Sequence, residues 1–251
     1  MSALAILTYH SLDDSGSVLS TSPSAFTEQM RILWESNVRV VPLGMIGDAL
    51  ARMNPAKPLV AITFDDGFRN VYECGFPVLR RFGFAATVFV VTDYCGKTND
   101  WPSQPHWVKR QPLLGWTEAR EMSRAGIIFG SHTRTHSDLR TLPPRQIEEE
   151  LVTSKRTIED ALGRSVNIFA YPYGAYDERV RKFSQSLFSL GCSTRLDFVR
   201  PGSDPLILER LDMYYLRRPK IFRHLFSGRM DVYIRFRRAM QGLRGRIQGR
   251  N

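Results

Sequence analysis

Short apolar runs rich in β-branched residues alternate along the chain with longer stretches of helical period. These runs predict six or seven strands, at residues 3–8, 38–41, 59–64, 85–91, 127–130, 166–170 and, as the seventh candidate, 192–194. Strands and helices in alternation require a mainly parallel sheet covered by helices. In such folds the chemistry lies at the carboxyl ends of the strands, so the residues that follow each run are candidates for a functional site.

Two helices have recognisable starts. Ser22 is placed to cap a helix with Pro23 at its first position, and Pro143-Pro144 opens another helix later in the chain. The apolar stripes expected on their buried faces are Phe26, Met30 and Leu33 in the first helix, and Ile147, Leu151 and Ile158 with the small Ser154 in the second. Each helix thus presents one apolar stripe to a sheet.

The composition is that of an ordinary folded protein, with 43% hydrophobic and 24% charged residues among 251, a length that suits one α/β barrel or two small domains. No stretch of the sequence approaches the roughly 18 to 20 apolar residues of a membrane-spanning helix. The first ten residues resemble a strand more than a secretory signal, because they lack a basic start. Three cysteines without C-x-x-C spacing argue against a disulfide framework and a cysteine zinc site, so we expect a reducing compartment.

Charge is distributed unevenly along the chain. The 35 basic and 25 acidic residues give 35 − 25 = +10, and residues 217–251 hold eleven of the basic residues against one acid, Asp231. The remaining residues are neutral overall, which argues against a nucleic-acid footprint over the whole body. Composition therefore predicts a domain at 1–216 and a basic tail at 217–251.

Asp65 and Asp66 follow the buried-strand run at 59–64 directly. Two adjacent carboxylates at such a place are costly unless a cation or hydrogen-bond donors compensate them. A metal ion is the simplest compensation. The alternative is a capped turn, because Asp66-Gly67 is a common turn pair.

His132 and His136 follow the apolar run at 127–130 and stand four residues apart. On a helical turn that spacing directs both imidazoles to one side, where they suit a divalent metal; alone, the pair is equally explained by two solvated loop histidines. Together with the Asp65-Asp66 strand end, the pair predicts a site with two imidazoles and one carboxylate. Such a set leaves coordination positions for water, as catalytic sites require.

At this point the sequence resembles a known family. Thr63-Phe64-Asp65-Asp66-Gly67-Phe68 and His132-Thr133-Arg134-Thr135-His136 look like the first two motifs of the polysaccharide deacetylases with a NodB-homology domain, carbohydrate esterase family 4, and Phe169-Ala170-Tyr171-Pro172-Tyr173-Gly174 is similar to their third. The resemblance covers about residues 3–212. It implies an α/β fold, a distorted (β/α)7-type barrel, and metal-dependent removal of an N-acyl group from an amino sugar. The basic tail lies outside the resemblance, and its own apolar spacing predicts a helix.

The resemblance also implies roles for individual residues. It makes Asp66, His132 and His136 the metal ligands and Asp65 the general base. The backbone N–H of Tyr173 would complete an oxyanion hole, unless residues 171–174 are only a rigid turn. The ligand set suits zinc, but also cobalt, nickel or iron.

Two family features are missing at their usual places. The late Leu-x-His motif that supplies a general acid in many members is absent, but Leu7-Thr8-Tyr9-His10 resembles the opening Tyr-His of the poly-N-acetylglucosamine deacetylase branch. We therefore expect His10 to be the general acid, the alternative being a structural histidine. The arginine before the third motif is also absent, and Arg210 is the candidate for its charge, although an arginine beside an apolar run is more often in a surface ion pair.

Two segments lie outside the repeating pattern. Residues 92–115 contain three prolines and no clear period, which predicts a long loop, and its Trp101 and Trp107 either stack on sugar rings or pin the loop to the body. In the tail, apolar residues recur among arginines at helical spacing, a pattern typical of helices on anionic membrane surfaces. These apolar residues are Val232, Phe236, Met240, Leu243 and Ile247. A solvated tail is the main alternative, and an RNA-binding tail is a weaker one.

The sequence thus leads to a working hypothesis: a metal-dependent hydrolase that removes acetyl or formyl from an N-acylated amino sugar in a polysaccharide, oligosaccharide or lipid-linked glycan. We expect a cytoplasmic protein, with peripheral contact to the inner face of the membrane through 217–251. The alternatives are a catalytically silent carbohydrate-binding protein and a scaffold for polysaccharide assembly. A glycosidase fits less well, because adjacent Asp65 and Asp66 do not flank a bond as paired carboxylates must.

Overall fold

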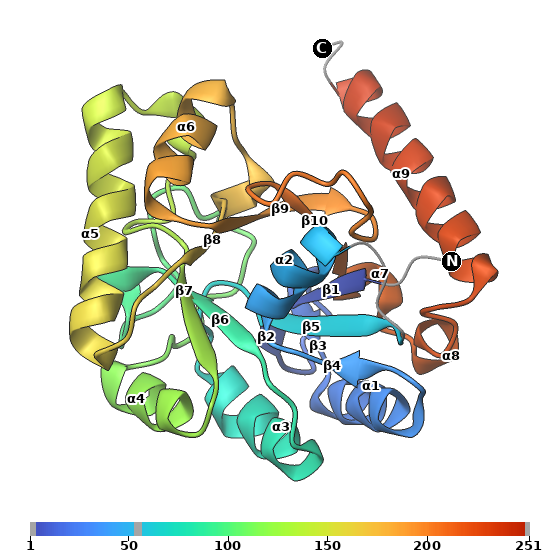
Figure 1. Ribbon diagram of the computed structural model, residues 1–251. Helices are drawn as coiled ribbons and strands as arrows, with labels where there is room; N and C mark the ends of the chain where they lie inside the picture. Colours follow the sequence, from blue (N-terminus) through green and yellow to red (C-terminus); the bar gives the residue numbers. More distant parts are fainter. Residues whose placement is uncertain (1–3, 53–56, 249–251) are drawn as a thin grey trace.

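Seven parallel strands close into a barrel in the computed structural model. The model describes residues 4–52 and 57–248, and the side chains of all of these except 50–52 and 241–248. The ring consists of β1 (Leu4–Tyr9), β5 (Leu59–Phe64), β6 (Thr87–Val90), β7 (Ile128–Ser131), β8 (Ile168–Ala170), β9 (Leu190–Leu196) and β10 (Leu208–Asp212). β1 pairs with β5 on one side and with β10 on the other, which closes the barrel. The predicted (β/α)7-type barrel is confirmed (Figure 1).

Helices surround the barrel (Figure 1). They are α1 (Pro23–Glu35), α2 (Leu43–Arg52), α3 (Phe76–Phe82), α4 (Trp116–Arg124), α5 (Pro144–Leu162), α6 (Glu178–Leu187), α7 (Met213–Leu216), α8 (Pro219–Phe222) and α9 (Gly228–Gln248). Ser22 caps α1 as predicted, by accepting a hydrogen bond from the backbone N–H of Ala25 at 3.1 Å. The predicted stripe of α5 is also confirmed, because Ile147, Leu151, Ser154 and Ile158 are all buried.

One predicted strand lies outside the closed ring, and one strand of the ring was not predicted. β4 (Arg39–Val40) pairs with Leu59 and Val60, on the edge of β5 that β6 occupies further along, and is not part of the closed ring. The ring instead includes β10, which the sequence pattern did not reveal as a strand. Its Arg210 breaks the apolar run yet lies inside the barrel, so a buried charge concealed the strand. Two short strands, β2 (Ser11–Leu12) and β3 (Ser20–Thr21), form a separate pair.

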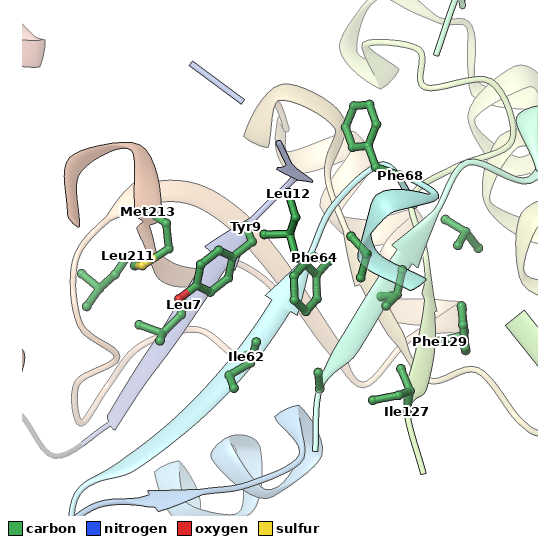
Figure 2. Packing of buried hydrophobic residues seen from close by; sticks show 14 of the residues in the cluster. Leu7, Tyr9, Leu12, Ile62, Phe64, Phe68, Ile127, Phe129, Leu211 and Met213 are labelled. Atoms are coloured by element: carbon green, nitrogen blue, oxygen red, sulfur yellow. The ribbon is translucent and has the colours of Figure 1, made fainter. Parts of the chain in front are cut away.

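Both faces of the barrel strands are buried. Alternate residues of β1 and β5 face outward into the main core under the helices, among them Leu7, Tyr9, Ile62 and Phe64 (Figure 2). The residues between them face a second, interior cluster. Leu43 and Ile46 of α2 pack there with the first residues of β1, β5 and β9, so α2 closes the amino end of the barrel. The interior becomes polar towards the other end, which is where a site can form.

Part of the basic segment packs against the barrel domain. Phe222, Leu225, Met230 and Ile234 are all at most 4% exposed and belong to the main core. Leu243 and Ile247 lie outside the residues whose side chains are described. Within the described chain, no helix combines the length and the hydropathy needed to cross a bilayer.

Candidate active site

Backbone strain is concentrated at the carboxyl ends of the strands. In the described ranges, the residues other than glycine with positive φ are Asp66, Thr133, His136 and Tyr173, at 68°, 68°, 59° and 59°. Left-handed backbone is uncommon for such residues, and strained positions cluster at functional sites. The four residues lie in the three sequence motifs, so the strain marks the same place that the motifs predicted.

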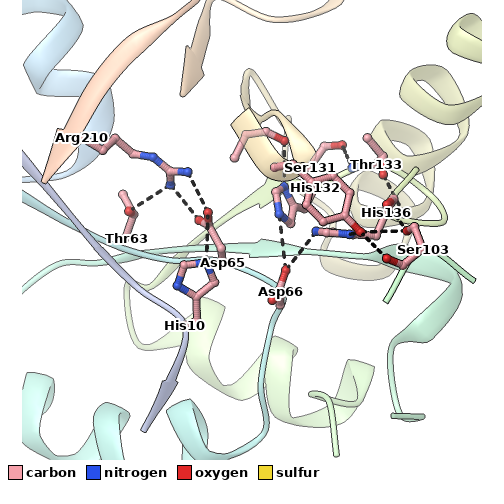
Figure 3. Close-up of polar contacts among 12 residues, drawn as sticks. His10, Thr63, Asp65, Asp66, Ser103, Ser131, His132, Thr133, His136 and Arg210 are labelled. Carbon is pink, nitrogen blue, oxygen red and sulfur yellow. Dashed lines mark hydrogen bonds and ion pairs between the residues drawn. The ribbon is translucent and has the colours of Figure 1, made fainter. Parts of the chain in front are cut away.

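Asp66, His132 and His136 come together at this end of the barrel. Asp66 Oδ1 lies 3.4 Å from His132 Nε2 and 3.3 Å from His136 Nε2 (Figure 3). One possible ligand atom from each of the three residues lies within 4.8 Å of those of the other two. All three side chains are at most 6% exposed. Three buried atoms with ligand lone pairs at this spacing fit one divalent metal ion.

The outer nitrogens of both histidines are hydrogen-bonded. His132 Nδ1 donates to the backbone oxygen of Ala170 at 2.8 Å, and His136 Nδ1 donates to the hydroxyl of Tyr173 at 3.1 Å. The Ala170 carbonyl can only accept, which assigns the His132 proton to Nδ1. The Tyr173 hydroxyl donates to Ser103, so it can accept from His136 Nδ1 in the same tautomer, and the lone pair of each Nε2 then faces Asp66.

Burial lowers the pKa of His136, which favours its neutral, ligating form. Burial would lower the pKa of His132 as well, but its hydrogen bond to Asp66 and the charges of Asp65 and Asp66 raise that pKa. The fit to a metal ion therefore rests on the positions of the three ligand atoms.

Asp65 is bound by Arg210. Nη1 and Nη2 of the arginine donate to Oδ1 and Oδ2 of Asp65, each at 2.7 Å, and Nε donates to the backbone oxygen of Ser193 at 2.8 Å. Burial alone would raise the pKa of Asp65, but the charge and hydrogen bonds of Arg210 hold that pKa below its usual range. Asp65 therefore stays ionised, as a proton acceptor must be.

His10 lies beside the same carboxylate. Its Nε2 is 4.0 Å from Asp65 Oδ2, and 18% of its side chain is exposed. Figure 3 shows Asp65 between Arg210 and His10, with Asp66 on the side of the two metal-site histidines. The partly buried carboxyl of Asp212, at the end of β10, also belongs to this region: desolvation raises its pKa, and the field of His10 opposes that rise.

The arrangement matches a known family. A family model described as polysaccharide deacetylase covers residues 52–188, more than half of the chain. The chain belongs to the polysaccharide deacetylase family. The family resemblance inferred from the motifs is thereby confirmed, and the protein is a hydrolase of the deacetylase class.

Individual relatives agree with this assignment. The deacetylase is 28% identical to YxkH of Bacillus subtilis, which is named as a polysaccharide deacetylase, over 92% of this chain and 76% of the relative. It is 24% identical to a poly-β-1,6-N-acetyl-D-glucosamine N-deacetylase of Staphylococcus aureus, over 76% of this chain and 67% of the relative. The structure of the Streptococcus pyogenes deacetylase PplD in complex with acetate superposes with a TM-score of 0.73 and 25% identity, covering 83% of this chain and 91% of PplD.

The tryptophans of the long loop have different places in the deacetylase. Trp101 is 2% exposed and stacks on the ring of His136 at 4.4 Å, so it pins the loop to the site. Trp107 is 63% exposed, as the sugar-stacking interpretation requires. Ser103 of the same loop accepts a hydrogen bond from the Tyr173 hydroxyl at 2.8 Å. No sequence motif points to Ser103, because its role depends on how the loop folds back.

Glu150 holds the turn that carries both histidines. Its Oε2 accepts from the backbone N–H groups of Arg134 and Thr135, each at 2.9 Å, and its Oε1 accepts from the Thr135 hydroxyl at 2.6 Å. The sequence shows three glutamates in a row, and only the structure distinguishes buried Glu150 from exposed Glu148. Glu150 is a positioning residue for the strained turn.

Glu150→Gln is expected to lower the free energy of unfolding by about 1–3 kcal/mol, because one buried acceptor of the turn becomes a donor. Glu148→Gln removes the same charge from an exposed position of α5 and should change stability by less than about 0.5 kcal/mol. Urea denaturation of both variants checks this. Equal stability of the two variants would show that Glu150 does not support the turn.

Proposed function

We propose that the protein is a metal-dependent N-deacetylase of amino-sugar glycans. The observation that carries this proposal is the convergence of Asp66, His132 and His136 beside an Asp65 that is held ionised by Arg210. A divalent ion held by those three ligands would supply Lewis-acid polarisation of the amide carbonyl and acidify a water in the site. Zinc is our first choice, with cobalt, nickel and iron compatible with the same ligands.

The chain's own residues divide the remaining work. Asp65, ionised and one residue from a ligand, is the base that takes a proton from the attacking water. Tyr173 is the second residue of a 3-10 turn, Pro172–Gly174, so its N–H has no acceptor within that turn and is free for the developing oxyanion. His10 is the acid that protonates the departing amine. Arg210 binds both Asp65 oxygens and fixes the base in place.

The names of two relatives support the proposed substrate class. The Staphylococcus aureus relative is named for poly-β-1,6-N-acetyl-D-glucosamine, and PplD was solved with acetate. We propose that this chain likewise releases acetate from N-acetylated amino sugars, in a polysaccharide, an oligosaccharide or a lipid-linked glycan. Formate release from an N-formyl sugar is the second possibility, because the proposed roles of Asp65, His10 and the metal ion act on the amide bond that acetyl and formyl groups share.

An acetate-release screen tests this function. The chain is stripped of metal, reloaded separately with zinc, cobalt, nickel or iron(II), and offered β-1,6-linked and β-1,4-linked N-acetylglucosamine oligomers and lipid-linked amino sugars. We expect acetate release that depends on metal and is lost in His132→Ala. Sugar binding without release of acetate or formate under any metal would instead identify a silent carbohydrate-binding protein.

His10→Gln is expected to lower kcat roughly 10²–10⁴-fold, the usual contribution of a positioned acid, with little change in KM. Zinc affinity should be unchanged, since His10 lies beside Asp65 and outside the metal-ligand group. The matched control is His106→Gln, a change in the long loop. Substrates with a better leaving group should lose less rate in His10→Gln; an equal loss for all leaving groups would contradict the role as acid.

A further inference from the structure

Helix α9 carries an apolar stripe that faces away from the protein. Val232, Phe236 and Met240 follow one another at four-residue intervals and are 68%, 59% and 39% exposed. Met230 and Ile234, on another side of the helix, are 1% exposed and pack into the core. In Figure 1, α9 runs along the outside of the barrel. The stripe is therefore left uncovered while α9 is held in place by its other side.

A basic cavity of about 290 Å³ borders this stripe. Its lining is Tyr214, Tyr215, Arg217, Arg218, Ile221, Tyr233 and Arg237. The guanidinium of Arg217 lies 5.1 Å from the ring centre of Tyr214, and that of Arg237 lies 4.5 Å from the ring centre of Tyr215. These cation–π contacts orient the arginines without neutralising them.

The cavity arginines differ from other arginines of this region in their partners. Arg238, the residue after Arg237 in α9, forms an ion pair with Asp197, and Arg223 forms one with Glu28. Among the residues with described side chains, no acidic group lies within 4.0 Å of Arg217, Arg218 or Arg237. Several guanidinium groups around one cavity, with no acid to neutralise them, suit the oxygens of a phosphate group.

The stripe and the cavity form one continuous surface. Tyr233 and Arg237 of the cavity precede Phe236 and Met240 of the stripe by three residues, a spacing that makes them neighbours on a helix. We propose that this surface docks on a bilayer containing anionic phospholipid, with a headgroup phosphate in the cavity and the stripe at the acyl boundary. A basic helix with an exposed apolar face fits such an interface, whereas nucleic acid offers no apolar phase for the stripe.

Docking would place the catalytic end of the barrel near the bilayer. Tyr214 follows Arg210 by four residues, so their Cα atoms are at most about 14 Å apart. A glycan attached to a lipid would then present its sugars close to Asp65. This consequence rests on the proposed function, but the docking itself does not, and it is measured without any sugar.

Vesicle sedimentation with the full chain tests the docking. Vesicles of phosphatidylcholine alone are compared with vesicles that also contain phosphatidylglycerol. The cavity variant Arg217→Gln/Arg237→Gln is expected to bind the anionic vesicles roughly 30-fold more weakly. Each arginine near an anionic surface contributes about 1 kcal/mol, and about 1.4 kcal/mol corresponds to a tenfold change in affinity. Phe236→Ser should weaken binding about tenfold, since its exposed ring no longer enters the acyl boundary.

A charge-matched variant separates docking from general electrostatics. Arg124→Gln/Arg145→Gln removes two exposed arginines from α4 and α5, which lie across the barrel from α9 (Figure 1). This variant should change vesicle binding less than about twofold, because salt screens the interaction between charges more than about 10 Å apart. Arg217→Lys/Arg237→Lys retains the charge and provides a folded comparison if the glutamine variant is unstable. Truncation at Leu216 would be a poor test, since it removes buried Phe222 and Ile234 from the core.

Three results would overturn the proposal. The first is equal vesicle binding by the cavity variant and the charge-matched variant. The second is binding of inorganic phosphate in the cavity without any binding of anionic vesicles, which would identify a site for soluble phosphates. The third is binding of an RNA oligonucleotide that depends on Arg217 and Arg237 while vesicles do not bind. A loss of acetate release, with vesicle binding intact, would instead count only against the proposed function.

Discussion

Asp65→Asn is expected to lower kcat for acetate release roughly 10²–10⁴-fold, because the amide oxygen that replaces the carboxylate cannot accept a proton from water. Asp65 is 2% exposed and both its oxygens are bound by Arg210, so the variant removes a base that is buried and fixed in place. Zinc affinity should be retained, because Asp66 and not Asp65 lies in the metal-ligand group. Initial rates on the metal-loaded enzyme, together with zinc titration calorimetry, measure both quantities.

The control for this variant is Asp160→Asn, which makes the same change at an exposed position of α5 and should leave kcat unaltered. Retention of the full rate by Asp65→Asn would exclude Asp65 as the base. A loss of both rate and zinc binding would assign Asp65 to the metal site instead. The two readouts thus distinguish proton transfer from metal ligation.

Arg210→Met is expected to lower the free energy of unfolding by about 3–5 kcal/mol, because it leaves the Asp65 carboxylate buried without its cation. Arg210 is 1% exposed, and methionine keeps much of its apolar length while removing every donor to Asp65 and to the Ser193 carbonyl. Activity should fall as well, since the base loses the contact that fixes its position. Denaturant unfolding and initial rates measure the two effects.

A double variant shows whether the two residues act as a pair. In Asp65→Asn/Arg210→Met both charges are gone, so stability should be higher than the sum of the single losses predicts. Arg210→Lys is expected to restore only part of the stability, since an ammonium group cannot bind both carboxylate oxygens as the guanidinium does. Unchanged stability in Arg210→Met would show that the buried ion pair does not hold this part of the barrel together.

Much of the site was predictable because its motifs are local. Asp65-Asp66 and His132-His136 each follow an apolar strand, and parallel strands bring such ends together at one edge of a barrel. The sequence indicated this neighbourhood without distances. It also placed His10 at the end of the first strand, where the structure has it beside Asp65. The chemical role of each residue remains a prediction until the variants are measured.

The supporting contacts were harder to predict because they join distant parts of the chain. Arg210 is separated from Asp65 by 145 residues, and beside an apolar run an arginine is more often in a surface ion pair. For the same reason β10 was not predicted: a strand with an inward arginine lacks the apolar pattern of its neighbours. Ser103 and Glu150 depend in the same way on contacts that form only when a loop and a helix fold against the histidine turn.

The sequence by itself determined the alternation of strands and helices, the strand ends that carry the chemistry, and the concentration of positive charge after residue 216. These features depend on residues close together in the sequence: the spacing of apolar residues, the capping residues at helix starts, and like charges next to one another. They can therefore be inferred from local patterns. Only the tertiary structure decided which charges are buried together and which apolar residues of the basic segment remain exposed. Burial and pairing depend on surfaces contributed by distant segments, and the stripe of α9 was distinguishable from its buried side only once Met230 and Ile234 were seen to pack against the core.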